Sequence, residues 1–147
     1  MTEAEMVDLA YQYFEDNCDY KEIVMEVPYL SRCIDMVMVN HENEIYSVEF
    51  KLKNWRKAIE QAKDHKNGAD YAYICIPRPP KGISEVLTNA VIEAGIGLMV
   101  FECNDNGPIV YEEIKPEKEI HNWYPIVESL KRIINRISEN QIFCLDG

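Results

Sequence analysis

The stretch Cys33–Lys53, CIDMVMVNHENEIYSVEFKLK, decides the fold, because it holds two apolar runs that each carry an acidic residue. Asp35 interrupts the first run and Glu49 the second, and the polar turn Asn40–Asn43 separates the runs. An ionised carboxylate inside a strand is costly unless it is paired, hydrogen-bonded or coordinated. If the two runs pair as a β-hairpin, Asp35 approaches Glu49 from the neighbouring strand.

Alternation along the second run separates two sets of side chains, because successive residues of a strand point to opposite faces. We expect a core face of Tyr46, Val48, Phe50 and Leu52, and a polar face of Ser47, Glu49, Lys51 and Lys53. Two carboxylates and one ammonium at one place suit a magnesium-dependent phosphodiester hydrolase. The carboxylates bind the hard cation, the metal activates water, and the lysine places positive charge beside the attacked phosphorus. The alternative is an exposed Glu49–Lys51 ion pair, worth only about 0–1 kcal/mol.

The apolar periodicity and the capping and turn residues predict the order α-β-β-β-α-β-α-β-β-α. This order indicates one α/β domain over residues 1–147, with a mixed sheet, helices on both faces, and a C-terminal hairpin and helix. The predicted elements are a helix over Thr2–Asn17, strands over Ile23–Val27, Arg32–Val39 and Glu44–Leu52, a helix over Asn54–Lys66, a strand over Tyr71–Pro77, a helix over Ser84–Ala94, strands over Ile96–Glu102 and Ile109–Ile114, and a helix over Asn122–Ser138.

An acid in one strand, a hairpin, Glu49-Phe50-Lys51 in the next strand and a following helix resemble the PD-(D/E)xK nuclease superfamily. That group includes restriction endonucleases and Holliday junction resolvases. The resemblance covers Glu15 to Pro77, about half of the chain, and implies a restriction endonuclease-like αβββαβ core. Ile34 stands where many members have a proline. His65 stands where some members have a tyrosine, four residues after a glutamine.

The resemblance also implies a set of site residues. Asp35, Glu49, Lys51 and Gln61 are the expected catalytic residues. Mg²⁺, for which Mn²⁺ is expected to substitute, is held by Asp35, Glu49 and the backbone carbonyl of Phe50. A glutamate from the first helix or first strand completes the metal shell in many members. Glu15 and Glu26 both qualify on sequence, and Glu26 is included among the expected ligands.

Charge is distributed unevenly along the chain. The net charge of −11 argues against a general nucleic-acid-binding surface, since phosphate contacts need Lys and Arg. The segment Lys51–Lys66 nevertheless carries six basic and two acidic residues, a local balance of +4, so the remainder carries −15. We expect Lys53, Arg56, Lys57 and Lys63 to contact nucleic acid beside the carboxylates. The alternative is an ordinary solvated helix face.

The remaining features bound the biological setting. The five cysteines form no Cys-x-x-Cys pair, which favours buried thiols in a reducing cytoplasm. No apolar run is long enough to span a bilayer, and no secretory signal is visible at the acidic N-terminus.

Together these patterns predict a cytoplasmic, metal-dependent nuclease that hydrolyses phosphodiester bonds in DNA, with a homodimer as a plausible assembly. The competing hypothesis is a catalytically inactive module of the same fold that binds a protein partner in a DNA-processing or defence complex. Its support is the acidic balance outside the basic segment.

Overall fold

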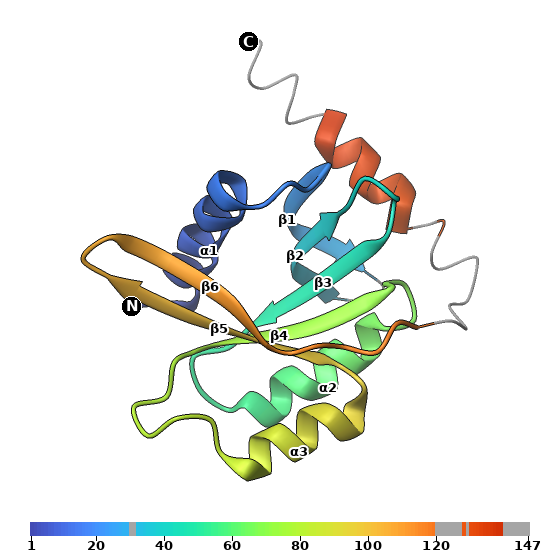
Figure 1. The fold of residues 1–147 in the computed structure, drawn as a ribbon. Coiled ribbons are helices and arrows are strands. Elements are labelled where there is room, and N and C mark those ends of the chain that lie inside the picture. Colours follow the sequence, from blue (N-terminus) through green and yellow to red (C-terminus); the bar gives the residue numbers. More distant parts are fainter. Residues whose placement is uncertain (30–31, 120–127, 129, 140–147) are drawn as a thin grey trace.

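A computed structural model of the chain describes residues 1–29, 32–119, 128 and 130–139. It contains a six-stranded mixed sheet with helices on both faces, as the sequence predicted (Figure 1). The elements are α1 (Glu3–Asn17), β1 (Glu22–Tyr29), β2 (Arg32–Val39), β3 (Ile45–Phe50), α2 (Trp55–His65), β4 (Tyr71–Pro77), α3 (Glu85–Ala94), β5 (Gly97–Asn104) and β6 (Gly107–Ile114). Residues 130–139 are helical, and residues 122–127 of the predicted terminal helix lie outside the described part.

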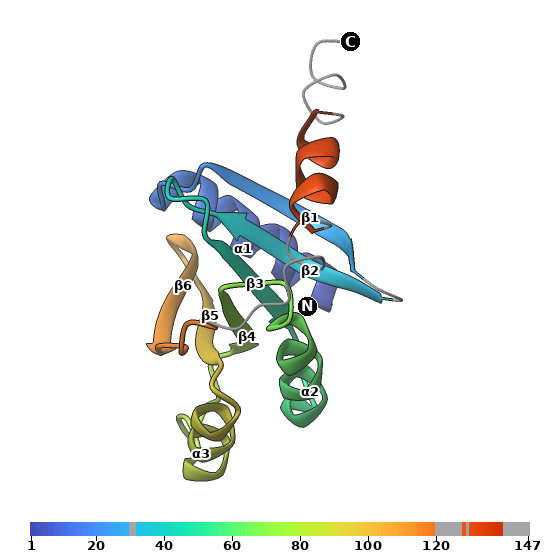
Figure 2. The same ribbon diagram turned by 90° about the vertical axis from the view of Figure 1, so that its right-hand side faces the viewer.

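Strand order in the sheet follows the chain, β1-β2-β3-β4-β5-β6. The strands β1, β2 and β3 form an antiparallel meander, β3, β4 and β5 are parallel, and β6 returns antiparallel to β5. Parallel neighbours need a crossover connection, which α2 and α3 provide. Both helices pack on the same face, in one apolar cluster that includes Ala58 of α2, Leu87 of α3 and Ile74 of β4, and they lie below the sheet in Figures 1 and 2.

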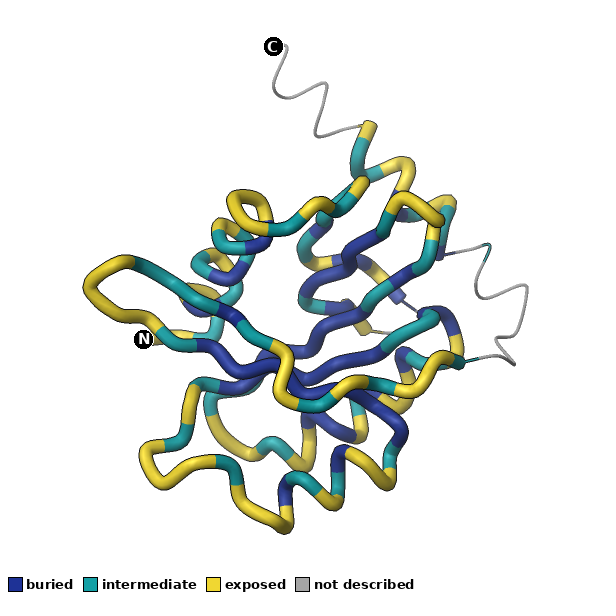
Figure 3. Tube along the Cα trace, viewed as in Figure 1, coloured by how far each residue is buried: buried dark blue, intermediate teal, exposed yellow. Residues whose placement is uncertain are grey.

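The opposite face is covered by α1, which begins with the predicted capping box between Thr2 and Glu5. Met6 and Phe14 of this helix pack against Val48 of the sheet. The C-terminal helix closes the β1–β2 end, where its Leu130 and Ile134 are buried against both strands. The central strands are therefore buried on both sides, while the tip of the β5–β6 hairpin is exposed (Figure 3).

The predicted polar face of β3 is wrong for Ser47 and Glu49, whose side chains are only 0% and 5% exposed. In the parallel register Ser47 pairs with Ala72 and Glu49 with Ile74, so all four face α2. Alternation distinguishes the two faces of a strand, but only the returning helix decides that both faces are covered. Lys51 and Lys53 follow the end of β3, and they are half-buried and exposed respectively.

Two further points concern the sequence predictions. The first strand was expected to end before Pro28, but β1 continues through Pro28 to Tyr29. A proline is tolerated there because β1 is an edge strand. Within the described residues, no helix is both long and apolar enough to cross a membrane.

His65 sets an acid limit on the stability of this fold. Burial lowers the pKa of its imidazole from 6.5 to about 4, and the ring packs edge-on against Tyr29. The unfolded chain takes up this proton near pH 6.5, whereas the folded chain resists it until about pH 4. The stabilisation is present above pH 6.5 and is lost as the pH falls through 4, by at most roughly 3 kcal/mol.

We therefore expect His65→Phe to flatten the fall in unfolding free energy between pH 6.5 and 4, measured by urea denaturation. The matched control is His41→Phe, because His41 is exposed in a turn. An unchanged acid slope in the His65 variant would contradict this account.

Candidate active site

The candidate site lies where β2 and β3 separate. The two strands pair from Val39 and Ile45 as far as Met36 and Val48, and the regular ladder stops there. Beyond that point the Phe50 backbone N–H donates a 2.8 Å hydrogen bond to Oδ2 of Asp35. A carboxylate thus takes the place of a main-chain acceptor, and β2 and β3 diverge there. We call this opening, between Asp35 of β2 and Glu49-Phe50 of β3, the fork. The predicted approach of Asp35 to Glu49 across the hairpin is confirmed, because the two carboxyl groups lie close enough for the charge of Asp35 to act on the pKa of Glu49.

The two carboxyl groups act on one another's proton affinity in opposite directions. Burial, followed by the charge of Asp35 and a hydrogen bond to it, raises the pKa of Glu49 to about 8, against the opposing pull of Lys51. Burial also raises the pKa of Asp35, while the Phe50 N–H and a hydrogen bond with Glu49 act in the opposite direction. Two adjacent carboxylates that are shielded from water favour a cation between them.

The polar atoms at the fork fit a divalent cation. Oε2 of Glu49 is buried without a hydrogen-bond partner, and such an orphaned oxygen calls for a ligand or water. In the described part of the chain, no three His, Cys, Asp or Glu side chains gather closely enough to hold an ion by themselves. Asp35, Glu49 and the Phe50 carbonyl would therefore need water or substrate oxygens to complete a shell, as Mg²⁺ commonly does.

Lys51 stands beside this pair, and its charge acts on both carboxyl groups. Its backbone N–H donates to the Cys75 carbonyl at 3.1 Å, so β4 fixes its position. Its Nζ lies 3.9 Å from Oε1 of Glu3, and the same oxygen accepts a 3.1 Å hydrogen bond from the Leu52 N–H. The first turn of α1 therefore braces the end of the strand that carries the lysine.

Glu3 is a residue that sequence reasoning missed. The candidates from the sequence were Glu15 and Glu26. Glu15 lies 12 residues further along α1, roughly 18 Å away along the helix axis, and is exposed. The only sequence signal for Glu3 was its place in the first turn after the Thr2 capping box. That signal identifies a helix start without saying what lies beside it.

Glu26 reaches the site through a strained backbone. Its φ of +53° is in the left-handed region, which costs a non-glycine residue roughly 1–3 kcal/mol. It falls opposite Asp35, in a gap of the β1–β2 ladder between the pairs Met25–Met36 and Val27–Ile34. Four carboxylates line a hollow of about 480 Å³ at this gap, which we call the acidic hollow: Glu3, Asp8, Glu26 and Asp35.

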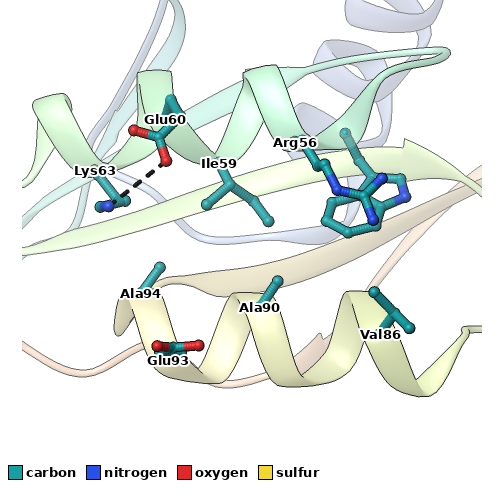
Figure 4. Close-up of a pocket in the computed structure, with 9 residues that line it drawn as sticks. Arg56, Ile59, Glu60, Lys63, Val86, Ala90, Glu93 and Ala94 are labelled. Carbon is teal, nitrogen blue, oxygen red and sulfur yellow. Dashed lines mark ion pairs between the residues drawn. The ribbon is translucent and has the colours of Figure 1, made fainter.

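Gln61 lies on α2, the helix that follows β3. It is half-buried, and its Oε1 has no hydrogen-bond partner. Lys57, one turn earlier, lies on the same side of the helix as Gln61. Arg56 and Lys63 instead point into a groove between α2 and α3 of about 510 Å³, the α2–α3 groove, where Lys63 pairs with Glu60 (Figure 4). The basic residues predicted to bind nucleic acid therefore divide between two surfaces.

Comparison with known proteins identifies the fold. No family model matches the chain, and no curated protein matches it in sequence. A protein of unknown function from Silicibacter pomeroyi, SPO1766, superposes with a TM-score of 0.69 at 11% identity, over 100% of this chain and 93% of the other.

A repair endonuclease from Pyrococcus abyssi superposes with a TM-score of 0.53 at 19% identity, over 67% of this chain and 46% of the endonuclease. Pyrococcus furiosus SfsA, solved with Ca²⁺, overlaps at a TM-score of 0.41 and 14% identity, over 78% and 62% of the two chains. The superposition on the repair endonuclease shows that the chain has a nuclease-like fold.

The buried carboxyl pair predicts an alkaline limit on the stability of the metal-free protein. Folded Glu49 keeps its proton up to about pH 8, whereas in the unfolded chain it ionises near 4.5. Its stabilisation is present below pH 4.5 and is lost as the pH rises through 8. In EDTA at pH 8, we expect Glu49→Gln to have a higher free energy of unfolding than the wild type, by on the order of a few kcal/mol, measured by urea denaturation. At pH 4.5 the free energies of unfolding of the two proteins should differ little.

Glu42→Gln is the matched control, because Glu42 is exposed in the turn before β3. A stability difference between Glu49→Gln and wild type that stays constant over this pH range would refute the burial of an ionisable Glu49.

Proposed function

We propose that this protein is a divalent-metal-dependent nuclease that hydrolyses phosphodiester bonds in DNA. The observation that carries the proposal is the Asp35–Glu49 carboxyl pair at the fork, with Lys51 beside it. The nuclease-like fold, shared with a repair endonuclease, supports it.

Asp35, Glu49 and the Phe50 carbonyl would hold the metal ion. When bound, a divalent ion supplies Lewis-acid chemistry, because it lowers the pKa of water and offsets phosphate charge. Glu26 is retained as a further candidate ligand, since it lines the same hollow as Asp35.

The chain's own residues would perform the rest of the reaction. Lys51, held by the β4 ladder and by Glu3, places an ammonium where negative charge accumulates on the phosphorus. Gln61, with a free buried oxygen, would orient water or substrate by hydrogen bonding. Lys53 and Lys57, both exposed, would contact the phosphate backbone.

We expect the wild type to cleave single-stranded, duplex or branched DNA in Mg²⁺ or Mn²⁺, and Asp35→Asn and Glu49→Gln to remove that cleavage. Asparagine is preferred to alanine at position 35 because its side-chain oxygen still accepts the Phe50 N–H. Lys51→Arg should lower the rate about 100-fold, since placement matters as well as charge.

Glu15→Gln is the control for cleavage, because Glu15 is exposed at the far end of α1. Equal cleavage by the wild type and the Glu49 variant would remove the site assignment. Absence of cleavage on all three DNAs would favour the inactive nuclease-fold module that binds a protein partner.

Metal binding can be tested without catalysis. We expect Mn²⁺ at about 100 times its Kd to stabilise the wild type by about 2.7 kcal/mol, seen as a rise in Tm. Asp35→Asn and Glu49→Gln should lose this rise, while Glu15→Gln keeps it. A rise of equal size in all four proteins would place the ion elsewhere.

A further inference from the structure

Lys51 lines a further hollow, which shares no lining residue with the acidic hollow. It has a volume of about 290 Å³ and lies where β3 and β4 end and α2 begins. Lys51, Lys53, Trp55, Pro77, Arg78 and Pro79 contribute to its lining, and we call it the basic hollow. Ligands of open α/β sheets bind outside the carboxyl ends of the parallel strands, which is where this hollow opens.

The charges of the lining residues distinguish the basic hollow from the acidic hollow and from the α2–α3 groove. Four carboxylates and no cation line the acidic hollow, whereas two cations and two carboxylates line the α2–α3 groove. Three cations and no carboxylate line the basic hollow, although the chain as a whole carries −11. A local concentration of positive charge on an acidic protein selects an anionic ligand.

The basic hollow adjoins the candidate active site through Lys51, whose charge acts on Asp35 and Glu49. Lys51 lines it, and the N–H of the preceding residue, Phe50, is held by Asp35 of the acidic hollow. A strand whose phosphate occupies the basic hollow therefore brings its neighbouring phosphodiester to the boundary between Lys51 and the carboxyl pair. The two hollows separate the recognition of phosphate from the binding of a cation.

Arg78 of the basic hollow is held in place before a ligand arrives. The Arg78 N–H donates to the Phe101 carbonyl at 2.9 Å, and its guanidinium donates to Glu102 at 2.7 Å. The side chain of Arg78 is still 62% exposed, so its guanidinium can donate hydrogen bonds to a phosphate as well. Trp55 and the prolines supply rigid apolar walls, and the Arg56 guanidinium covers the Trp55 ring at 4.3 Å. Aromatic rings and arginine planes are the surfaces on which unpaired bases stack.

We propose that the basic hollow is a nucleotide subsite, in which Lys53 and Arg78 bind a phosphate of the substrate strand and Trp55 contacts the adjoining base. This inference rests on the proposed nuclease function and names the part of the substrate that the protein grips. A volume just below the ~300–1,000 Å³ range of ligand pockets suits one nucleotide unit of a single strand.

The test measures binding without cleavage. A fluorescein-labelled short oligothymidylate is titrated in EDTA, and its anisotropy is followed at several salt concentrations. We expect Lys53→Gln and Arg78→Gln each to weaken binding about threefold to tenfold and to reduce the salt slope by about 1. Arg78→Lys should retain the slope.

Lys115→Gln is the matched control, because Lys115 is exposed after β6 and lines neither of the two hollows nor the α2–α3 groove. We expect its affinity and salt slope to equal those of the wild type. The chain has two tryptophans, so in a Trp123→Phe background the emission of Trp55 should be quenched by the oligonucleotide.

Wild-type affinity in the Lys53 and Arg78 variants, or an equal loss in Lys115→Gln, would overturn the subsite. Failure of the wild type to bind would also overturn it. The two proposals fail separately. If Asp35→Asn abolishes cleavage but Arg78→Gln leaves oligonucleotide binding unchanged, the nuclease proposal stands and the subsite proposal fails. Binding that needs Arg78 in a protein that cuts no DNA leaves the subsite without the nuclease.

Discussion

The hydrogen bond from the Phe50 N–H to the Asp35 carboxylate is the constraint on which the site depends. A sheet tolerates a carboxylate between two central strands only if that group replaces a main-chain acceptor. Asp35 does so, and the β2–β3 ladder ends at that point. This arrangement brings Glu49 against Asp35 and leaves Lys51 at the mouth of the opening, next to the first turn of α1. A regular ladder through residues 35 and 49 would close the fork and leave no room for a ligand.

Several unfavourable features accumulate around the fork. Glu49 is buried with an oxygen that has no partner, Gln61 has another, and Glu26 adopts a left-handed backbone conformation. Each feature lowers stability, and the surrounding apolar clusters on both faces of the sheet compensate for the loss. Strain and unsatisfied polar groups that persist at one place in a well-packed protein are typical of functional sites.

The electrostatics of this protein are local. The chain has a net charge of −11, but charge of each sign is concentrated near the end of β3. Four carboxylates line the acidic hollow, and three cations line the basic hollow. Metal-dependent hydrolysis of a phosphodiester uses both kinds of charge. The phosphate oxygens require positive charge, and the divalent ion requires carboxylates. The position of Lys51 at the boundary, paired with Glu3, connects the two surfaces.

The sequence by itself determined the order of the elements, the hairpin that brings Asp35 to Glu49, and the position of Glu49 in the strand that follows the hairpin turn. These follow from local periodicity and turn chemistry, which a linear chain displays directly. Only the tertiary structure decided that Ser47 and Glu49 are buried and that Glu3, and not Glu15, reaches the site. It also decided that the basic residues of α2 lie on two surfaces and that Arg78 and Lys53 line the same hollow. These outcomes depend on which helix returns over which face of the sheet, and that packing brings together residues far apart in sequence.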